Sequence, residues 1–471
     1  MSGFQEGLFI TCRDIFCFHN IDRYGGAMTM SEITKEMILQ KVEKLKIRFV
    51  RLKFTDIMGV PKNVEIPVSV LGEALDGKRL FDGSSVQGFC RIEESDMYLQ
   101  PDLNTFLVNP WEEERDVARI ICDIVNPDKT PFLGCARTNL KRVIAELKEM
   151  GFTANFGPEM EFYLFAKDEN NKATTKTNDQ ASYFDLSPID LGEEVRRDMV
   201  IALEKLGFEV EASHHEVGPG QHEIDFRYSD GITTADRIMV LKLTSKTIAM
   251  WHNLHVTFMP KPVYGIPGSG MHTNISLYKN GDNAFYNSKN KNGLSEEALY
   301  FIGGLMKHAK GLTAITNPLV NSYKRLVSGY EAPVYIAWSH RNRSPLIRVP
   351  VAREDATRIE LRSPDTSCNP YLAFAVILSA GIDGIKKKIM PPNPVNENIY
   401  SMDESQLKKY GIENLPSNLK EALEEFKKDK VLQQGLTEHI ISNYLRAKYQ
   451  EWENYSLQVH PWELEQYLAV Y

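Results

Sequence analysis

The sequence lacks the features of three common classes of protein. Its six cysteines are scattered and form no C-x-x-C pair, which excludes the usual zinc motifs and a dense disulfide framework. The longest apolar run, Tyr371–Ile382, is shorter than the roughly 20 residues of a membrane-spanning helix. Basic residues number 55 and acidic residues 63, a net charge of −8, whereas proteins that coat nucleic acid or anionic membranes are usually basic. We therefore expect a cytoplasmic protein with reduced cysteines and neither a nucleic-acid nor a membrane partner.

The length of the chain predicts more than one domain. At 471 residues it exceeds the roughly 250–300 residues at which a single hydrophobic core stops growing. Residues 1–30 show no clear periodicity, and we interpret them as an atypical extension that is not native, with Met28 or Met30 as the natural start. Short alternating runs at 47–54, 64–68, 102–108 and 117–125 predict a small sheet-containing domain over residues 31–128.

Helices alternate with strands in the rest of the chain, which we assign to a second domain over residues 135–471. Helical spacing of apolar residues predicts helices at 138–150, 191–206, 234–253, 295–315, 370–387, 418–428 and 432–455.

Four of the predicted strands carry charge or polarity on one face. Period two places Glu159 beside Glu161 in one strand and Glu223 beside Asp225 in another, while two further strands contribute polar faces with a histidine and an acid. An antiparallel sheet with a solvated side alternates in the same way, so a single strand of this kind would mean little. If the four faces converge, they form an oxygen-rich cluster with one imidazole: Glu159, Glu161, Glu216, Glu223, Glu360 and His272. Such a cluster requires hard divalent cations, magnesium or manganese rather than zinc.

Arginines and lysines gather in the C-terminal half of this acidic chain, at Lys324, Arg325, Arg341, Arg343, Arg348, Arg358 and Arg362. Arginines near metal-binding acids suit a polyphosphate and a carboxylate substrate. No G-x-x-x-x-G-K-[ST] motif is present, so a nucleotide would be held by metals and arginines. The residues alone therefore indicate a metal-dependent phosphoryl-transfer or ligase site.

Several longer motifs resemble one enzyme family. They are FDGSS (81–85), GPEMEF (157–162), HHEVGPGQHE (214–223), GSGMH (268–272), NSYKRLVSGYEAP (321–333), RNRSPLIRVP (341–350) and RIELRSPD (358–365). Together they resemble the glutamine synthetases of the bacterial and archaeal type I, in order from about residue 45 to the C terminus. The runs GFCRIEESD and QVHPWELEQYLAVY are similar to the alpha class, which glutamine feedback-inhibits.

The resemblance implies an α+β fold. A small N-terminal β-grasp-like domain would precede a large catalytic domain built on a curved antiparallel sheet with surrounding helices. It also implies ATP-dependent ligation of ammonium to the γ-carboxylate of L-glutamate through γ-glutamyl phosphate, giving glutamine, ADP and phosphate. Two to three Mg²⁺ or Mn²⁺ ions per active site would be needed. One would be held by Glu161, Glu216 and Glu223, and another by Glu159, His272 and Glu360.

The remaining site residues also follow from the resemblance. The implied catalytic residues are Asp82, Glu331 and Arg343. ATP would contact Glu211, Tyr228, Ser276, Arg343, Arg348 and Arg358. Glutamate would contact Glu161, Gly268, His272, Arg325, Glu331 and Arg362. Ammonium would contact Asp82, Tyr183, Glu216 and Glu331, and Arg91 would sense glutamine.

The family resemblance further implies a homo-oligomer, a dodecamer of two hexameric rings, in which Asp82 serves the neighbouring subunit's site. A transcription regulator of nitrogen metabolism is an implied partner of the alpha class. Two alternatives stay open: a γ-glutamyl-amide ligase that uses a polyamine or other amine, and a non-catalytic nitrogen-sensing assembly. Retention of Asp82, Tyr183 and Glu331 favours ammonium over larger amines.

Overall fold

The computed structural model describes residues 33–86, 88, 95–330, 332–340 and 342–471. The predictions for the extension 1–30, Arg91 and Glu331 concern residues outside these ranges, as does Arg341 of the basic cluster.

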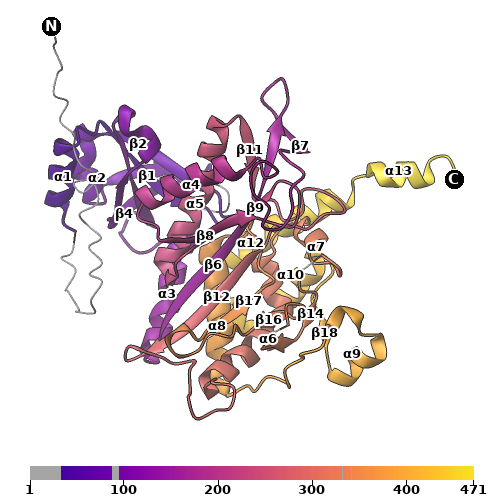
Figure 1. Cartoon of the computed structure of the whole chain (residues 1–471). Coiled ribbons are helices and arrows are strands. Elements are labelled where there is room, and N and C mark those ends of the chain that lie inside the picture. Colours follow the sequence, from indigo (N-terminus) through magenta and orange to yellow (C-terminus); the bar gives the residue numbers. More distant parts are fainter. Residues whose placement is uncertain (1–32, 87, 89–94, 331, 341) are drawn as a thin grey trace, which may run out of the picture.

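The first domain is a five-stranded sheet accompanied by two helices (Figure 1). The strands are β1 (Phe49–Thr55), β2 (Pro61–Pro67), β3 (Arg79–Asp82), β4 (Asp96–Val108) and β5 (Val117–Val125), and the helices are α1 (Lys35–Lys44) and α2 (Leu71–Leu75). The strand order is β2-β1-β5-β4-β3, with β1 and β5 parallel and the other neighbours antiparallel. In β1, Val50, Leu52 and Phe54 are buried at alternate positions, which confirms the period read from the sequence.

The second domain is built on an eleven-stranded sheet whose main path is β15-β16-β17-β12-β6-β9-β8. Its strands are β6 (Thr153–Lys167), β7 (Ala173–Thr177), β8 (Val210–His215), β9 (Gln221–Phe226), β10 (Ser229–Asp230), β11 (Leu254–Thr257), β12 (Met271–Lys279), β13 (Asp282–Asn283), β15 (Trp338–Ser339), β16 (Ile347–Arg348) and β17 (Ile359–Leu361). A separate pair joins β14 (Tyr335–Ile336) to β18 (Glu413–Asn414). The long strand β6 is the centre of the sheet, because β7, β9, β10, β11 and β12 all pair with it.

Helices accompany this sheet in the second domain. They are α3 (Ala136–Glu149), α4 (Glu193–Lys205), α5 (Gly231–Trp251), α6 (Glu296–Thr316), α7 (Ser322–Arg325), α8 (Pro370–Lys387), α9 (Glu404–Tyr410), α10 (Leu419–Lys428), α11 (Lys430–Gln434), α12 (Glu438–Ser456) and α13 (Pro461–Tyr467). The expected α+β fold class is confirmed. The single helix predicted at 432–455 is wrong: the chain turns at Gly435, and the hydroxyl of Thr437 caps a new helix by accepting the Ile440 N–H.

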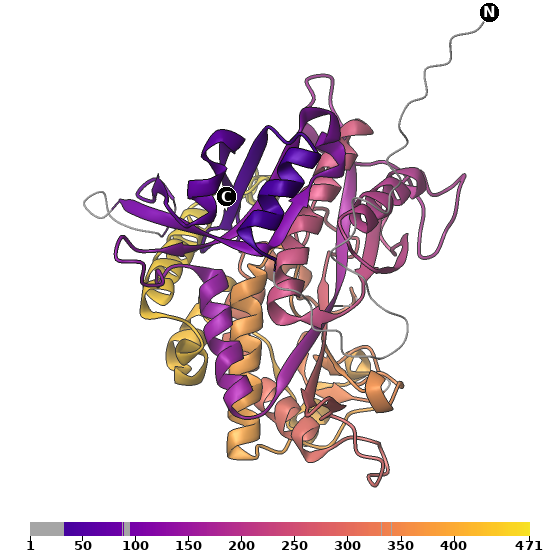
Figure 2. The ribbon, with the colours of Figure 1, turned by 90° about the vertical axis from the view of Figure 1, so that its left-hand side faces the viewer.

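Helix α8 contains the longest apolar run and is the core of the domain. Asn369 caps its start by accepting the Tyr371 N–H at 3.1 Å, and Pro370 occupies the first turn, where its missing N–H costs nothing. The ring of Phe374 stacks on Phe156 of β6 at 4.1 Å between centroids, while α3 and α6 lie along the helix (Figure 2). Other parts of the protein therefore cover the apolar side chains of this helix. Within the described ranges, no helix has both the length and the hydropathy that a membrane crossing demands.

Close backbone contact joins α6 to α8. A Cβ added at Gly384 would lie 2.1 Å from the Tyr300 carbonyl oxygen, and one added at Gly304 would lie 2.2 Å from the Ala380 oxygen. The two helices can approach this closely only because these positions have no side chain.

Arg137 connects the two domains. From α3 its guanidinium reaches Asp102 of β4 at 2.7 Å and Asp123 of β5 at 3.1 Å, and it also pairs with Asp236 of α5 at 2.8 Å. The phenol of Tyr371 in α8 donates to the same Asp236. One buried cation therefore fixes the first sheet against the helices of the second domain.

Candidate active site

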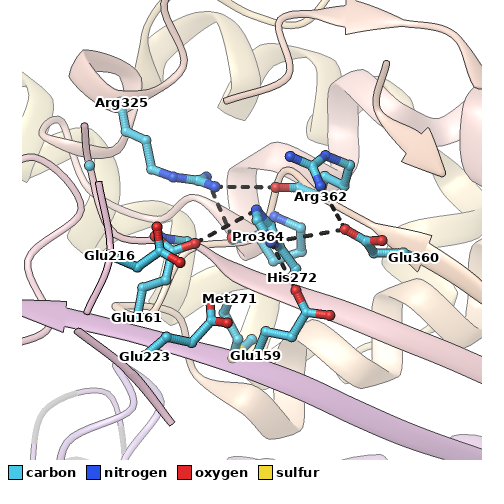
Figure 3. A network of polar contacts seen from close by, with 12 residues as sticks. Glu159, Glu161, Glu216, Glu223, Met271, His272, Arg325, Glu360, Arg362 and Pro364 are labelled. Atoms are coloured by element: carbon cyan, nitrogen blue, oxygen red, sulfur yellow. Dashed lines mark hydrogen bonds and ion pairs between the residues drawn. The ribbon is translucent and has the colours of Figure 1, made fainter. Parts of the chain in front are cut away.

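Neighbouring strands bring the predicted acidic residues to one place. In the register of the sheet, Glu159 of β6 lies opposite His272 of β12, and Glu161 lies opposite Glu223 of β9. Glu360 of β17 continues the same surface. Figure 3 shows these side chains pointing into a shared space around His272. The convergence expected from period two is therefore present, because antiparallel pairing aligns the polar faces of adjacent strands.

Glu159, His272 and Glu360 form one compact group. The ligand atoms that these three residues offer all lie within 4.8 Å of one another. His272 Nδ1 donates to Glu159 at 3.1 Å and lies 3.9 Å from Glu360. The Asn274 amide donates to the other Glu159 oxygen at 3.0 Å. Although burial opposes its ionisation, these two donors help hold the pKa of Glu159 at about 2, so it is a carboxylate at neutral pH.

Glu161 is held rigidly beside this group. One of its oxygens accepts the Gly270 N–H at 2.8 Å and the Gln221 amide at 3.1 Å, while the other lies 3.9 Å from His272 Nε2. Glu216 belongs to the turn between β8 and β9, and Glu223 lies within β9, so the motif HHEVGPGQHE (214–223) forms a β-hairpin. His214, at the end of β8, lies 3.2 Å from Glu223 and 3.6 Å from Glu216.

Burial and the mutual repulsion of the acids disfavour full ionisation of the cluster. Burial, followed by the charges of Glu161, Glu159 and Glu216, raises the pKa of Glu223 well above its ordinary value. Burial and the neighbouring Glu223 raise the pKa of Asp225 to about 9. Divalent cations would relieve this repulsion, and carboxylate oxygens with one imidazole suit magnesium or manganese. The residues present therefore fit these ions.

Arginines border the acids on the opposite side. Glu360 is fully buried and pairs with Arg348 and Arg362, the latter at 2.7 Å. Arg325 is also buried, and its guanidinium donates to the carbonyl oxygens of Ser363 at 2.8 Å and Arg362 at 3.2 Å. Gly268 lies against it, where a Cβ would meet the Pro260 oxygen at 2.2 Å and Arg325 Cγ at 3.0 Å. Acids and guanidinium groups thus face each other across the site.

These groups surround a cavity of about 610 Å³. Twelve of the predicted site residues line it: Glu159, Glu161, Tyr183, Glu216, Glu223, Gly268, His272, Arg325, Arg343, Arg348, Glu360 and Arg362. Pro267 lines it too, with its carbonyl oxygen accepting the Tyr163 hydroxyl at 2.6 Å.

Five predicted residues lie elsewhere. Asp82 ends β3 in the first domain, where its carboxylate accepts the N–H and hydroxyl of Ser84. Ser276 shares one face of β12 with His272 and Asn274, and Arg358 donates to Asn274 at 3.0 Å. Tyr228 follows β9, and Glu211 lies exposed in β8. The last four extend from the acidic cluster along the sheet rather than into the cavity.

Several polar residues of the site were not predicted as site residues. Tyr330, Asn342, Ser344, Asn398 and Tyr400 line the cavity, and three more lie among the acids. Gln221 and Asn274 orient carboxylates, and Asp225 lies beside Glu223. All three share a strand face with a predicted ligand two positions away, and that spacing could have identified them.

Comparisons with known proteins agree with this site. The glutamine synthetase beta-Grasp domain model matches residues 46–127, and the glutamine synthetase catalytic domain model matches residues 133–467. Glutamine synthetase of Clostridium saccharobutylicum is 56% identical over 443 residues, 94% of this chain and 100% of that protein. Glutamine synthetase of Staphylococcus aureus strain Mu50 is 54% identical over 446 residues, with the same coverage.

Solved structures share the fold. A GmaS/ADP complex superposes with a TM-score of 0.84 at 32% identity, covering 92% of this chain and 99% of that chain. The Plasmodium falciparum glutamine synthetase superposes with a TM-score of 0.83 at 28% identity, covering 92% of this chain and 98% of that chain. The resemblance seen in the motifs is thus confirmed over both domains, and the chain belongs to the glutamine synthetase family.

Proposed function

We propose that this protein is a glutamate–ammonia ligase. It would use ATP to phosphorylate the γ-carboxylate of L-glutamate, and ammonia would then displace phosphate to give glutamine. The observation that carries the proposal is that Glu159, His272 and Glu360 line one cavity together with Arg348 and Arg362, which pair with Glu360. This arrangement brings cation-binding acids and phosphate-binding guanidiniums to the same reacting atoms.

Two ligand sets would hold the divalent ions, Mg²⁺ or Mn²⁺: Glu161, Glu216 and Glu223 in one, and Glu159, His272 and Glu360 in the other. When bound, such ions supply charge neutralisation at the phosphates and polarise the transferred phosphoryl group.

The arginines would divide between the two anionic substrates. Arg325 lies beside Gly268 and Arg362 lines the same cavity, and both would bind the carboxylates of glutamate. Arg343 and Arg348 would stabilise the charge on the phosphoryl group as it moves. Ion pairing with Glu360 orients both Arg348 and Arg362, so their donors are preorganised before substrate arrives.

The nucleotide would extend along the sheet from the acidic cluster. Arg358, Ser276, Tyr228 and Glu211 continue outward from His272, and Tyr228 is 46% exposed, which leaves its ring accessible for stacking on adenine.

Ammonium would enter beside Glu216 and Tyr183, which line the cavity together. Their carboxylate and hydroxyl suit a small cation that must lose its water shell and then a proton. Asp82 and Glu331 complete the proposed pocket. Because Asp82 does not line its own chain's cavity, we assign it to the site of a neighbouring subunit.

An assembly follows from that assignment. We propose a cytoplasmic dodecamer of two hexameric rings, feedback inhibition by glutamine through Arg91, and contact with a transcription regulator of nitrogen metabolism.

The experiment that tests the proposed reaction measures phosphate release with glutamate and ATP, and identifies the product by mass spectrometry. Ammonium should support turnover and yield glutamine, while putrescine and ethanolamine should support far less. Faster turnover with either amine than with ammonium would instead support a γ-glutamyl-amide ligase that uses that amine. Absence of turnover with all three, in protein that binds Mn²⁺ and ATP, would contradict catalysis.

A further inference from the structure

A buried polar network lies behind Glu216, and the proposed reaction does not use it. Its members are Asp179, Asp190, Arg196, His215 and His222, all of them less than 9% exposed. They come from the segment after β7, from α4 and from the β8–β9 hairpin. Buried ionisable groups are costly unless they are paired, so this network needs a structural explanation.

Asp179 is the hub of the network. One oxygen of its carboxylate accepts the Gly220 N–H at 2.9 Å and the Ala181 N–H at 3.3 Å, and the other accepts the Leu191 N–H at 3.2 Å. His215 Nε2 donates to the first oxygen at 3.1 Å. One side chain therefore ties both ends of the 181–191 segment to the turn between β8 and β9.

His215 carries this connection to the site. Its Nδ1 donates to the backbone carbonyl oxygen of Glu216 at 2.6 Å, while Nε2 faces Asp179. Both ring nitrogens lie within hydrogen-bond distance of an oxygen, one on each side of the ring. The backbone of Glu216 is thereby linked to Asp179 through one rigid imidazole.

The network already contains its own positive charges. Arg196 pairs with Asp190 at 2.9 Å and donates to His222 Nδ1 at 2.9 Å. Arg196 compensates the charge of Asp190, and three backbone N–H groups donate to Asp179. On the far side of His222, a Cβ at Gly192 would meet the Nε2 atom at 2.6 Å, so the ring is closely packed there. A metal ion is therefore not needed, and the network serves to fix positions.

What it fixes is one wall of the cavity. The 181–191 segment carries Tyr183, whose ring stacks on Phe184 at 3.9 Å and meets His214 edge-on at 5.6 Å. Tyr183 and Glu216 are the two described residues assigned to the ammonium pocket of this chain. We propose that Asp179, acting through His215, is a positioning residue that sets Tyr183 and Glu216 at the correct separation to capture ammonium. This inference rests on the proposed function.

The test is Asp179→Asn. An amide can accept hydrogen bonds at only one of its two positions, so either the Gly220–His215 side or the Leu191 side loses its acceptor. We expect the KM for ammonium to rise at least about tenfold, while the KM for ATP changes less than about threefold. The matched control is Asp168→Asn, an exposed aspartate that also accepts two backbone N–H groups, from Asn170 and Lys172, but lies outside the network. It should leave both constants unchanged.

A second variant keeps the test decisive. His215→Asn retains a donor for the Glu216 carbonyl but loses the hydrogen bond to Asp179. It should therefore raise the KM for ammonium in the same way. In the double variant the KM for ammonium should be no more than about twofold above that of the worse single variant, because both substitutions break the same linkage. Additive effects, equal rises in the KM for ATP, or an unchanged ammonium KM would overturn the proposal. If Asp179→Asn does not assemble, His215→Asn decides alone.

A measurement without catalysis separates this inference from the proposed function. Hydrogen–deuterium exchange should rise at residues 181–191 and 216–221 in Asp179→Asn and not in the control. Unchanged exchange there would overturn the positioning role even if wild-type protein makes glutamine. Increased exchange in a protein that makes none would contradict only the proposed function.

Discussion

At the scale of the residue, Glu360 has two tasks. Its carboxylate belongs to the group that includes Glu159 and His272, and the same carboxylate pairs with Arg348 and Arg362 while fully buried. In the sequence it lies on a strand face between Arg358 and Arg362, but only Arg362 pairs with it, and the second partner, Arg348, comes from β16. Its burial was not predictable either, because burial depends on β12 and β16, which flank it in the sheet.

Glu360→Gln should lower turnover by about 100-fold or more, because it weakens one ligand set and leaves the buried guanidinium of Arg362 and the half-buried one of Arg348 without their counter-charge. Phosphate release and calorimetric Mn²⁺ titration measure the two effects. Glu146→Gln is the control, since its ion pair with Lys386 is exposed and contributes less than about 1 kcal/mol. Near-normal turnover of Glu360→Gln at ordinary magnesium would contradict the assigned role.

Binding of cations should release protons. Burial and the charge of Glu223 raise the pKa of Asp225 to about 9, so without metal this carboxyl carries a proton at pH 7, and burial also raises the pKa of Glu223. A cation stabilises the charged forms and expels bound protons. Calorimetry of Mn²⁺ binding at pH 7 in buffers of different ionisation enthalpy should show net release, and the release should decrease as the pH rises toward about 9. Equal apparent enthalpies in all buffers would contradict the expected protonation.

At the scale of the element, the sequence predicted regular helices well and short strands poorly. The bounds 370–387 of α8 were predicted correctly because Asn369 and Pro370 mark its start and a lysine run marks its end. Strand β3 was missed because its four residues, Arg79–Asp82, show no apolar alternation. The Asp179 network was also missed, since its members come from segments about 40 residues apart that only the fold unites.

Gly384→Ala should destabilise the protein by about 1–3 kcal/mol, since the new methyl group would meet the Tyr300 carbonyl oxygen between α6 and α8. This outweighs the gain of about 1 kcal/mol that alanine brings to a helix interior. Chemical denaturation measures the change. Gly72→Ala in α2 is the control: its nearest neighbour would be 4.0 Å away, so the substitution should be neutral or stabilising. Equal stability of the two variants would show that α6 and α8 can separate without cost.

At the scale of the whole molecule, two domains meet at the buried guanidinium of Arg137. The small domain was predicted from its alternating strands, but its placement was not, because Asp102, Asp123 and Asp236 are far apart in the chain and ordinary in sequence. This fixed placement keeps Asp82 out of its own chain's cavity, and the same placement would present it to another subunit.

Sharing of the site between subunits predicts complementation. Asp82→Ala and Glu360→Gln should each be nearly inactive alone, the first through ammonium capture and the second through metal binding. Co-expressed in equal amounts, they should recover about a quarter of wild-type turnover, because random neighbours create that share of sites with both residues intact. Mixing the separately assembled proteins without exchange is the control and should recover nothing. No recovery in co-assembled protein would place Asp82 in its own chain's site.

The position of Glu159 and Glu161 on one strand also constrains how this enzyme can change. Two residues of extended backbone span about 7 Å. Because β6 is paired along its length, the sheet fixes this distance between the two residues. Drift in the surrounding loops can reshape the entrance and alter which amine is admitted, but it cannot retune this spacing. We therefore expect substrate preference on this fold to change through the loops at the cavity entrance, while the spacing of Glu159 and Glu161 stays the same.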